Sequence, residues 1–308
     1  MFIYSNSNKR YHTLDYYLKN KYGSKVFKVS LNLGLTCPNI DGTKGFGGCI
    51  YCKNGSGDFA GKKENNLKKQ FEDIKNIMHN KWKEAKYIAY FQANTNTYGD
   101  LNYLKKCFEE VLTYKDVIGI NIATRCDAIN DECLSYLKEL NKKIDLVIEL
   151  GLQTIHEKTM NLCNLGYTLK EFEETYLRLK KSNIKVVVHI INGLPNETKE
   201  MMLETVNYLN KLKIYGIKIH MLHILKGTKL ELLYKKSPFP VLEKLEYANI
   251  VCDQLELLDE KIVINRITGD PKIDDLVEPE WLLKKFTVLN EIDKELKRRN
   301  SYQGMKAK

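Results

Sequence analysis

The amino-acid sequence predicts an α/β protein built on a partial (β/α)6 barrel with a small C-terminal extension. Short apolar runs rich in β-branched residues alternate with longer amphipathic stretches, which is the order of a parallel sheet covered by helices. The runs are almost continuously apolar, as in strands buried on both faces. Six such strands favour an open or partial barrel over a complete eightfold one. The expected strands cover residues 26–34, 87–93, 117–124, 145–152, 184–191 and 216–224, and the helices between them cover 64–83, 101–114, 130–142, 168–182 and 197–213.

The pattern changes after the sixth expected strand. A helix is predicted over residues 240–258, one further strand and a turn over 261–270, and a last helix over 279–299. No Pro- or Gly-rich linker separates this part from the barrel, so we expect it to pack on the barrel as an extension. The sequence thus divides into a basic N-terminal segment 1–25, a barrel 26–240 and a C-terminal extension 241–308.

Composition is that of a folded protein, with 43% hydrophobic and 29% charged residues in a chain of 308. No apolar run approaches the roughly 20 residues that a membrane-spanning helix needs. The first residues also lack the basic and apolar regions of a secretory signal. We therefore expect a cytoplasmic protein with no membrane partner.

The formal net charge is +10, and the surplus is concentrated at the two ends of the chain. Residues 1–30 contain six Lys or Arg against one acid, and residues 281–308 contain eight against three. Two interpretations remain open. These residues are either solvated helix faces or a rim that binds a polyanion such as RNA.

Three cysteines follow the first expected strand directly, in the segment TCPNIDGTKGFGGCIYC. In parallel α/β folds the chemistry lies at the carboxyl ends of the strands. Three thiolates can bind three irons of a 4Fe–4S cluster and leave the fourth iron open to a ligand. A structural zinc site requires four ligands and this loop supplies three, but zinc and ordinary core packing remain alternatives. The predicted cluster ligands are Cys37, Cys49 and Cys52.

The same loop, with the strand before it, resembles the radical S-adenosylmethionine (SAM) superfamily. The gaps of eleven and two residues between the cysteines are typical of the YhcC/YtqA-type branch, which is similar to the elongator-type radical SAM enzymes. The resemblance extends over nearly the whole chain. It rests on the segments RYHTLDYYLKNKYGSKVFKVSLNLGLTCPN, YFQANTNTY, VIELGLQT, INGLPNET, LHILKGT and NRITGD.

The resemblance implies that SAM lies across the strand tops and chelates the open iron through its methionine amino and carboxylate groups. The polar run after the second strand occupies the place where the superfamily binds the methionyl amine, which implies contacts from Gln92, Asn94 and Thr95. The backbone at Gly193, after the fifth strand, is expected to approach the adenine.

A charged residue within an apolar strand is costly unless it is paired, which singles out Glu149 in the fourth strand. The resemblance implies that Glu149 and Gln153 reach the ribose or the methionyl end of SAM. The alternative is that Glu149 pairs with Arg125 or with a lysine and only closes the barrel. On the sixth strand, His220 and His223 should point to opposite faces, so at most one of them should face the cavity.

The chemistry that the resemblance implies is reductive cleavage of SAM to a 5′-deoxyadenosyl radical, with an electron donor such as flavodoxin or ferredoxin. The implied substrate is tRNA, modified at the wobble uridine side chain. No acetyltransferase-sized domain follows the barrel, so an acetyl-derived transfer by this chain alone is not expected. Two alternatives remain: a radical SAM enzyme acting on a small metabolite or a protein, and a non-catalytic RNA-binding module stabilised by zinc.

Overall fold

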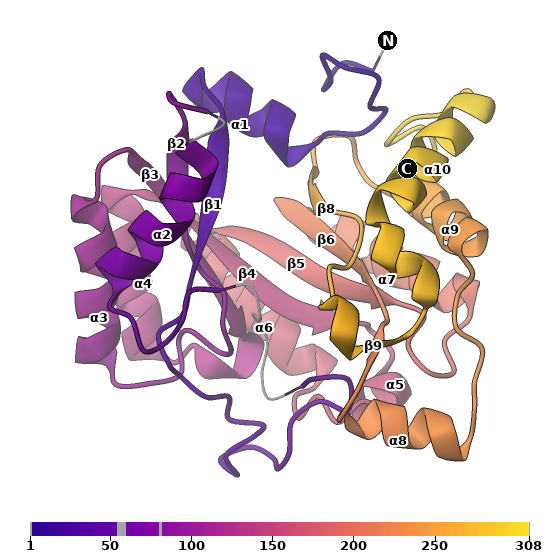
Figure 1. Ribbon diagram of the computed structural model, residues 1–308, viewed down its shortest axis with the longest axis horizontal. Coiled ribbons are helices and arrows are strands. Elements are labelled where there is room, and N and C mark those ends of the chain that lie inside the picture. The colour runs from indigo at the N-terminus through magenta and orange to yellow at the C-terminus, as the bar shows by residue number, and fades with distance from the viewer. Residues whose placement is uncertain (1, 54–59, 80–81, 308) are drawn as a thin grey trace.

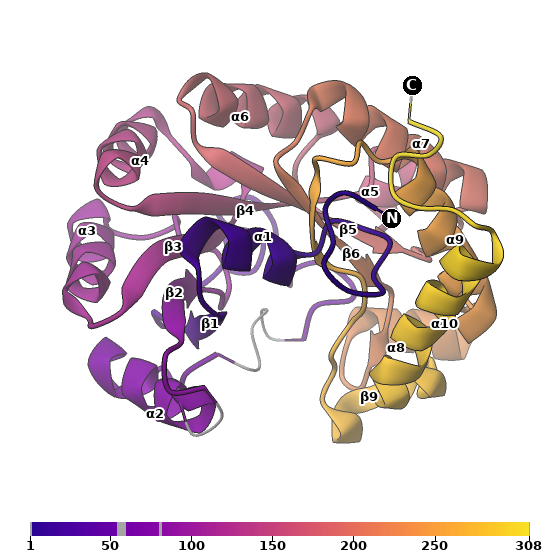
Figure 2. The same ribbon diagram turned by 90° about the horizontal axis from the view of Figure 1, so that it is seen from above.

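Seven parallel strands form one sheet that curls into a half-barrel (Figures 1 and 2). The computed structural model describes residues 2–53, 60–79 and 82–307. The strands are hydrogen-bonded in the order β1-β2-β3-β4-β5-β6-β8, so the predicted partial barrel is confirmed. Their bounds are β1 Val26–Leu31, β2 Lys86–Phe91, β3 Val117–Arg125, β4 Asp145–Gln153, β5 Lys185–Asn192, β6 Gly216–Met221 and β8 Val263–Arg266.

Helices cover the outer face of this sheet (Figure 2). Every helix predicted from the sequence is present, with bounds that differ by a few residues. The predicted helix 64–83 includes residues 80–81, which lie outside the described part of the chain. None of the described helices is long and apolar enough to cross a membrane. The main helices are α2 Leu67–His79, α3 Leu101–Glu110, α4 Asp131–Lys143, α6 Leu169–Lys181, α7 Lys199–Leu212, α9 Lys244–Leu257 and α10 Lys285–Arg298.

The segment predicted as an extension contributes to the barrel itself. Strand β8 pairs in parallel with β6 and adds a seventh strand to the sheet. The expected sixth strand ends earlier than predicted, at Met221, and of its last residues only Ile224 belongs to a separate short strand. The smaller elements are β7 Ile224–Leu225 paired with β9 Leu276–Glu278, helices α1 Leu14–Tyr22, α5 Glu157–Leu162 and α8 Lys229–Lys236, and 3-10 turns at Val111–Thr113, Cys126–Ala128, Ile273–Asp275 and Glu280–Lys284.

The N-terminal segment folds over the amino-terminal ends of the strands. Its helix α1 lies across that end of the half-barrel (Figure 2). Thr13 caps α1 through its side chain and forms a backbone bridge with Ile264 of β8. Lys21 and Tyr22 both contact Asp145, the first residue of β4.

The C-terminal tail packs at the same end. The backbone N–H of Gln303 donates to Arg10 O, and its side chain donates to Ile262 O just before β8. Both basic ends of the chain therefore lie opposite the end of the barrel that carries the cysteine loop (Figure 1). A polyanion-binding rim formed by these ends would therefore lie away from the cysteine loop.

Candidate functional site

A cavity of about 350 Å³ opens at the carboxyl ends of the strands, and Cys37, Cys49 and Cys52 all line it. Within the described ranges, no group of three or more His, Cys, Asp or Glu residues could hold a single metal ion. A 4Fe–4S cluster does not need its three cysteines around one ion, because each of them binds a different iron. The other five cysteines are buried, as expected for small apolar side chains.

Two asparagines fix the cysteine loop on the segment that follows α5. Asn39 Nδ2 donates to Asn164 O over 2.6 Å and lies 3.7 Å from Cys49 Sγ. Asn164 Nδ2 donates in return to Gly48 O over 2.8 Å. Gly48 has φ +71°, a conformation that costs glycine little and other residues more. The loop is therefore held from outside before any ligand binds.

Arg125, at the end of β3, lies beneath the same loop. It donates two hydrogen bonds to Asp127, of 2.9 and 2.7 Å, and its guanidinium lies 4.9 Å from the ring centroid of Tyr167. The predicted alternative that Arg125 pairs with Glu149 is therefore wrong, because Asp127 occupies the guanidinium. Burial raises the pKa of the Cys49 thiol, and the positive charge of Arg125 opposes that rise.

Glu149 is a fully buried carboxylate at the centre of the half-barrel, and the side chains of five other strands contact it. The alternative that Glu149 pairs with a lysine is confirmed, with two lysines rather than one. Lys28 Nζ of β1 and Asn121 Nδ2 of β3 donate to Oε1 over 2.6 and 2.8 Å, while Tyr90 Oη of β2, His189 Nε2 of β5 and Lys218 Nζ of β6 contact Oε2, the first two at 2.7 and 3.0 Å.

These contacts set the charge states at the centre. Burial would raise the pKa of Glu149, but the positive charges of Lys218 and Lys28 outweigh it and hold that pKa well below its usual value. Burial lowers the pKa of Lys218 to about 7, although Glu149 opposes the fall. Removing either partner would leave an uncompensated buried charge, so the contacts form one coupled unit.

The polar run after β2 contributes three of the expected SAM contacts, Gln92, Asn94 and Thr95, to the cavity lining. Asn94 has φ 59° and donates from Nδ2 to Leu35 O over 2.8 Å. Its Oδ1 atom is buried and accepts no hydrogen bond within the described part of the chain. A buried acceptor without a partner is costly, so Asn94 is suited to receive a donor from a bound molecule.

The other two residues expected to contact SAM, Gln153 and Gly193, differ in whether they line the cavity. Gln153, the last residue of β4, lines the cavity with φ 69°. Gly193 is not among the described residues that line it. Gly193 has φ +81°, a conformation that favours glycine, and a Cβ there would also meet the side chain of Leu242 at 3.0 Å.

Both His220 and His223 line the cavity, so the prediction that at most one of them faces it is wrong. His220 lies two residues after Lys218 on β6 and shares its face. β6 ends at Met221, and the alternation of faces no longer applies to His223 beyond it. His223 Nδ1 lies 3.2 Å from Met221 O, where it turns back toward the strand end.

Sequence reasoning missed Lys28, Lys218 and Arg266. The signal for the two lysines was available, since each is a charged residue within an apolar strand, as Glu149 is. For Arg266 no such signal existed, because it ends a four-residue strand whose place in the sheet is known only from the fold.

Comparison with known proteins agrees with this geometry. Residues 42–209 match the model of the Radical SAM superfamily, and residues 214–298 match the Radical_SAM C-terminal domain. The chain is 50% identical to YtqA of Bacillus subtilis over 304 residues, which cover 98% of this chain and 94% of YtqA.

Two further archaeal proteins are similar to part or most of the chain. A tRNA uridine(34) acetyltransferase of Methanocaldococcus jannaschii is 25% identical over 159 residues, 50% of this chain and 28% of that protein. The structure of Elp3 from Methanocaldococcus infernus, with an N-terminal deletion, superposes with a TM-score of 0.66 at 17% identity and covers 91% of this chain and 64% of that one. The superposition establishes a shared fold.

Proposed function

Because the chain belongs to the radical SAM superfamily, in the branch of YhcC and YtqA, we propose that it modifies tRNA at the side chain of the wobble uridine. The observation that carries the proposal is that Cys37, Cys49 and Cys52 line the same cavity as Asn94 and the buried Glu149. When bound, a reduced 4Fe–4S cluster and SAM would supply a 5′-deoxyadenosyl radical, with the electron coming from a flavodoxin or a ferredoxin.

The residues of the cavity fit these two groups. Three thiols of one glycine-rich loop would hold three irons, and Asn39 would keep the loop in place through its contacts with Cys49 and Asn164. Asn94 would offer its unpartnered Oδ1 to the methionyl amine of SAM. Gln92, Thr95 and Gln153 would supply further polar contacts, and the surrounding walls would exclude water from the reacting carbon.

The choice of tRNA is supported by the relation to the tRNA uridine(34) acetyltransferase, which covers half of this chain. That relation covers 28% of the acetyltransferase, so acetyl transfer is not carried over. The proposal therefore takes only the modified position, uridine 34 of tRNA, from that relative, and not the acetyl group. A small metabolite or a protein as substrate would be the outcome of a negative result with tRNA.

The chemistry is tested by iron analysis and SAM cleavage after anaerobic reconstitution. Wild-type protein should bind about four irons per chain and, with a reductant, release 5′-deoxyadenosine. Cys49→Ala should lose both properties. The matched control is Cys133→Ala, which removes a buried thiol of α4 outside the cavity and should retain both. Iron and cleavage retained in Cys49→Ala would contradict the proposal.

The substrate is tested by mass spectrometry of tRNA nucleosides from cells that lack the gene. We expect a change at the wobble uridine that is restored by the wild-type gene and not by Cys49→Ala. An unchanged nucleoside profile would exclude wobble-uridine modification and direct the search to small molecules and proteins.

A further inference from the structure

The lining of the cavity differs between its two sides. Toward β1 and β2 it consists of the cysteine loop and neutral amide or hydroxyl side chains. Toward β6 and β8 it is basic, and we refer to Lys218, His220, His223 and Arg266 as the basic wall. The proposed function assigns a role to the first side and none to the basic wall.

The basic wall is built by the sheet. Lys218 and His220 share one face of β6. Arg266 is the register partner of Lys218 on the neighbouring strand β8, which brings the two cations side by side. The ring of His189, on β5, lies 5.6 Å from that of His220. Three adjacent strands therefore direct nitrogen-bearing side chains toward the same part of the cavity.

The acids around the cavity leave this wall uncompensated. Glu149 accepts contacts from five side chains and has little capacity for more. Within the described part of the chain, the side chains of His220 and Arg266 form no hydrogen bond or ion pair with another residue, and Arg266 is exposed to solvent at the cavity. Asp270 is the other carboxylate of the lining, and it has interactions of its own.

The other cations of the lining are already paired. Arg125 is bound to Asp127, and Lys53 donates to Asp275 over 2.6 Å. The unused hydrogen-bond donors of the cavity are thus concentrated on the basic wall, on the guanidinium of Arg266 and the imidazole of His220. His223 already uses its Nδ1–H on Met221 O. Such donors bind carboxylate and phosphate oxygens with charge-assisted hydrogen bonds.

The wall is also able to gain charge. Burial lowers the pKa of His189 to about 4 and that of Lys218 to about 7, and it lowers the pKa values of His220 and His223. Neighbouring cations add to the fall: Lys218 for His189, and His189 and Arg266 for His220. Near pH 7 the imidazoles are therefore neutral, and a negative charge placed among them would favour their protonated forms.

We propose that the basic wall is a subsite for an anionic group of the substrate, a carboxylate or a phosphate, and that binding of this group is accompanied by uptake of a proton. The inference rests on the proposed function in one respect, namely that SAM occupies the opposite, amide-lined side of the cavity. Substrates with an anionic group near the reacting carbon are then favoured, because that group would accept charge-assisted hydrogen bonds from these donors.

The test is calorimetric titration of the cluster-loaded protein, with SAM present, using inorganic phosphate and, separately, acetate as probes. Arg266→Gln should weaken binding of the preferred probe about tenfold or more, and Arg266→Lys should restore part of the loss. Arg298→Gln removes an exposed guanidinium on α10 and is the matched control, expected to change the affinity less than about twofold. Tighter binding of phosphate or of acetate identifies the kind of anionic group.

Proton uptake is tested with acetate, which stays ionised above about pH 6. Its affinity should fall between about pH 6.5 and 8.5, as Lys218 loses its proton in the empty site. The heat of binding should also depend on the ionisation enthalpy of the buffer. Absence of binding to the SAM-loaded protein, or equal binding by Arg266→Gln and Arg298→Gln, would overturn the inference.

Failure of the proposed function is recognised separately, from iron content and SAM cleavage. A protein that binds four irons and cleaves SAM but binds neither probe refutes the basic wall alone. A protein that binds a probe through Arg266 without forming a cluster refutes the proposed chemistry and retains the anion site.

Discussion

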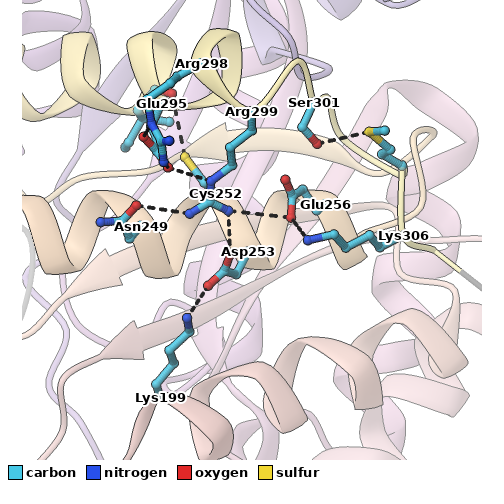
Figure 3. A network of polar contacts seen from close by, with 12 residues as sticks. Lys199, Asn249, Cys252, Asp253, Glu256, Glu295, Arg298, Arg299, Ser301 and Lys306 are labelled. Atoms are coloured by element: carbon cyan, nitrogen blue, oxygen red, sulfur yellow. Dashed lines mark hydrogen bonds and ion pairs between the residues drawn. The ribbon is translucent and has the colours of Figure 1, made fainter.

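Basic residues gather in two regions of this molecule, the ends of the chain and the basic wall of the cavity, and their surroundings are opposite. Directly after α10, Arg299 contacts Glu295, Asp253 and Glu256 within one network with α9 (Figure 3). In the basic wall, Lys218 is bound to Glu149, whereas the neighbouring Arg266 forms no ion pair within the described part of the chain. Charge that is neutralised locally cannot attract a ligand, whereas charge left unpaired in a cavity can.

The N-terminal segment follows the pattern of α10. Lys9 pairs with Asp293, Lys21 with Asp145, and Lys25 with Asp15. The first pair ties the segment to α10, the second ties it to the start of β4, and the third lies within the segment. Part of the positive charge counted at the ends of the sequence is thus paired with acids in the fold, whereas the basic wall places Lys218 of β6 and Arg266 of the edge strand β8 beside the cavity.

The largest effect is expected from Glu149→Gln, which removes the acid on which the interior cations depend. Lys218 and Lys28 would then be buried without a counter-charge, and the free energy of unfolding should fall by about 3–5 kcal/mol. Chemical denaturation measures it. Adding Lys218→Met should recover part of the loss, because the two sites are coupled. Glu139→Gln, which alters an exposed pair with Lys142, is the control.

If Glu149→Gln lowered the free energy of unfolding by less than about 1 kcal/mol, water or a relaxed geometry would have to compensate the charges of the two lysines. The contrast between the interior and the ends of the chain would then be much weaker than the contacts indicate. The control should change the stability by about 0.5 kcal/mol or less.

A smaller effect is expected in the pH dependence of stability. The pKa of Lys218 is about 7 in the folded protein against 10.5 for an ordinary lysine. Between these values the unfolded chain binds a proton that the folded chain does not, so stability contributed by this site rises with pH. Relative to Lys218→Met, wild-type protein should gain up to about 1.4 kcal/mol per pH unit above pH 7. Parallel stability curves for the two proteins would contradict the lowered pKa.

Most of the barrel could be predicted from the sequence, because buried parallel strands are apolar throughout and the helices between them have a clear apolar stripe. Helix α1 was missed since its sequence, LDYYLKNKY, buries only Leu18 fully and shows little periodicity. Helix α5 is six residues long, too short for a periodic signal.

The site residues that lie close together in the sequence were predicted, whereas those brought together from distant strands were not. Cys37, Cys49 and Cys52 are close in sequence, and their spacing is visible without a fold. Lys28 and Lys218 join Glu149 through the register of distant strands. The cost of a buried charge signals that each needs a partner, but only the sheet shows which one. Arg125 had a nearer acid in Asp127, two residues away, and the wrong pairing came from overlooking it.

The smallest effect is expected at the end of α10, and it completes the contrast. Arg298 is exposed and donates two hydrogen bonds to Glu295, of 2.7 and 2.6 Å. Exposed ion pairs contribute about 0–1 kcal/mol, and Glu295 keeps Arg299 as a second partner (Figure 3). Arg298→Gln should therefore lower the free energy of unfolding by less than about 1 kcal/mol in chemical denaturation. A loss comparable with that of Glu149→Gln would show that the terminal network stabilises the fold as strongly as the buried centre, because its members would then act cooperatively rather than as separate surface pairs.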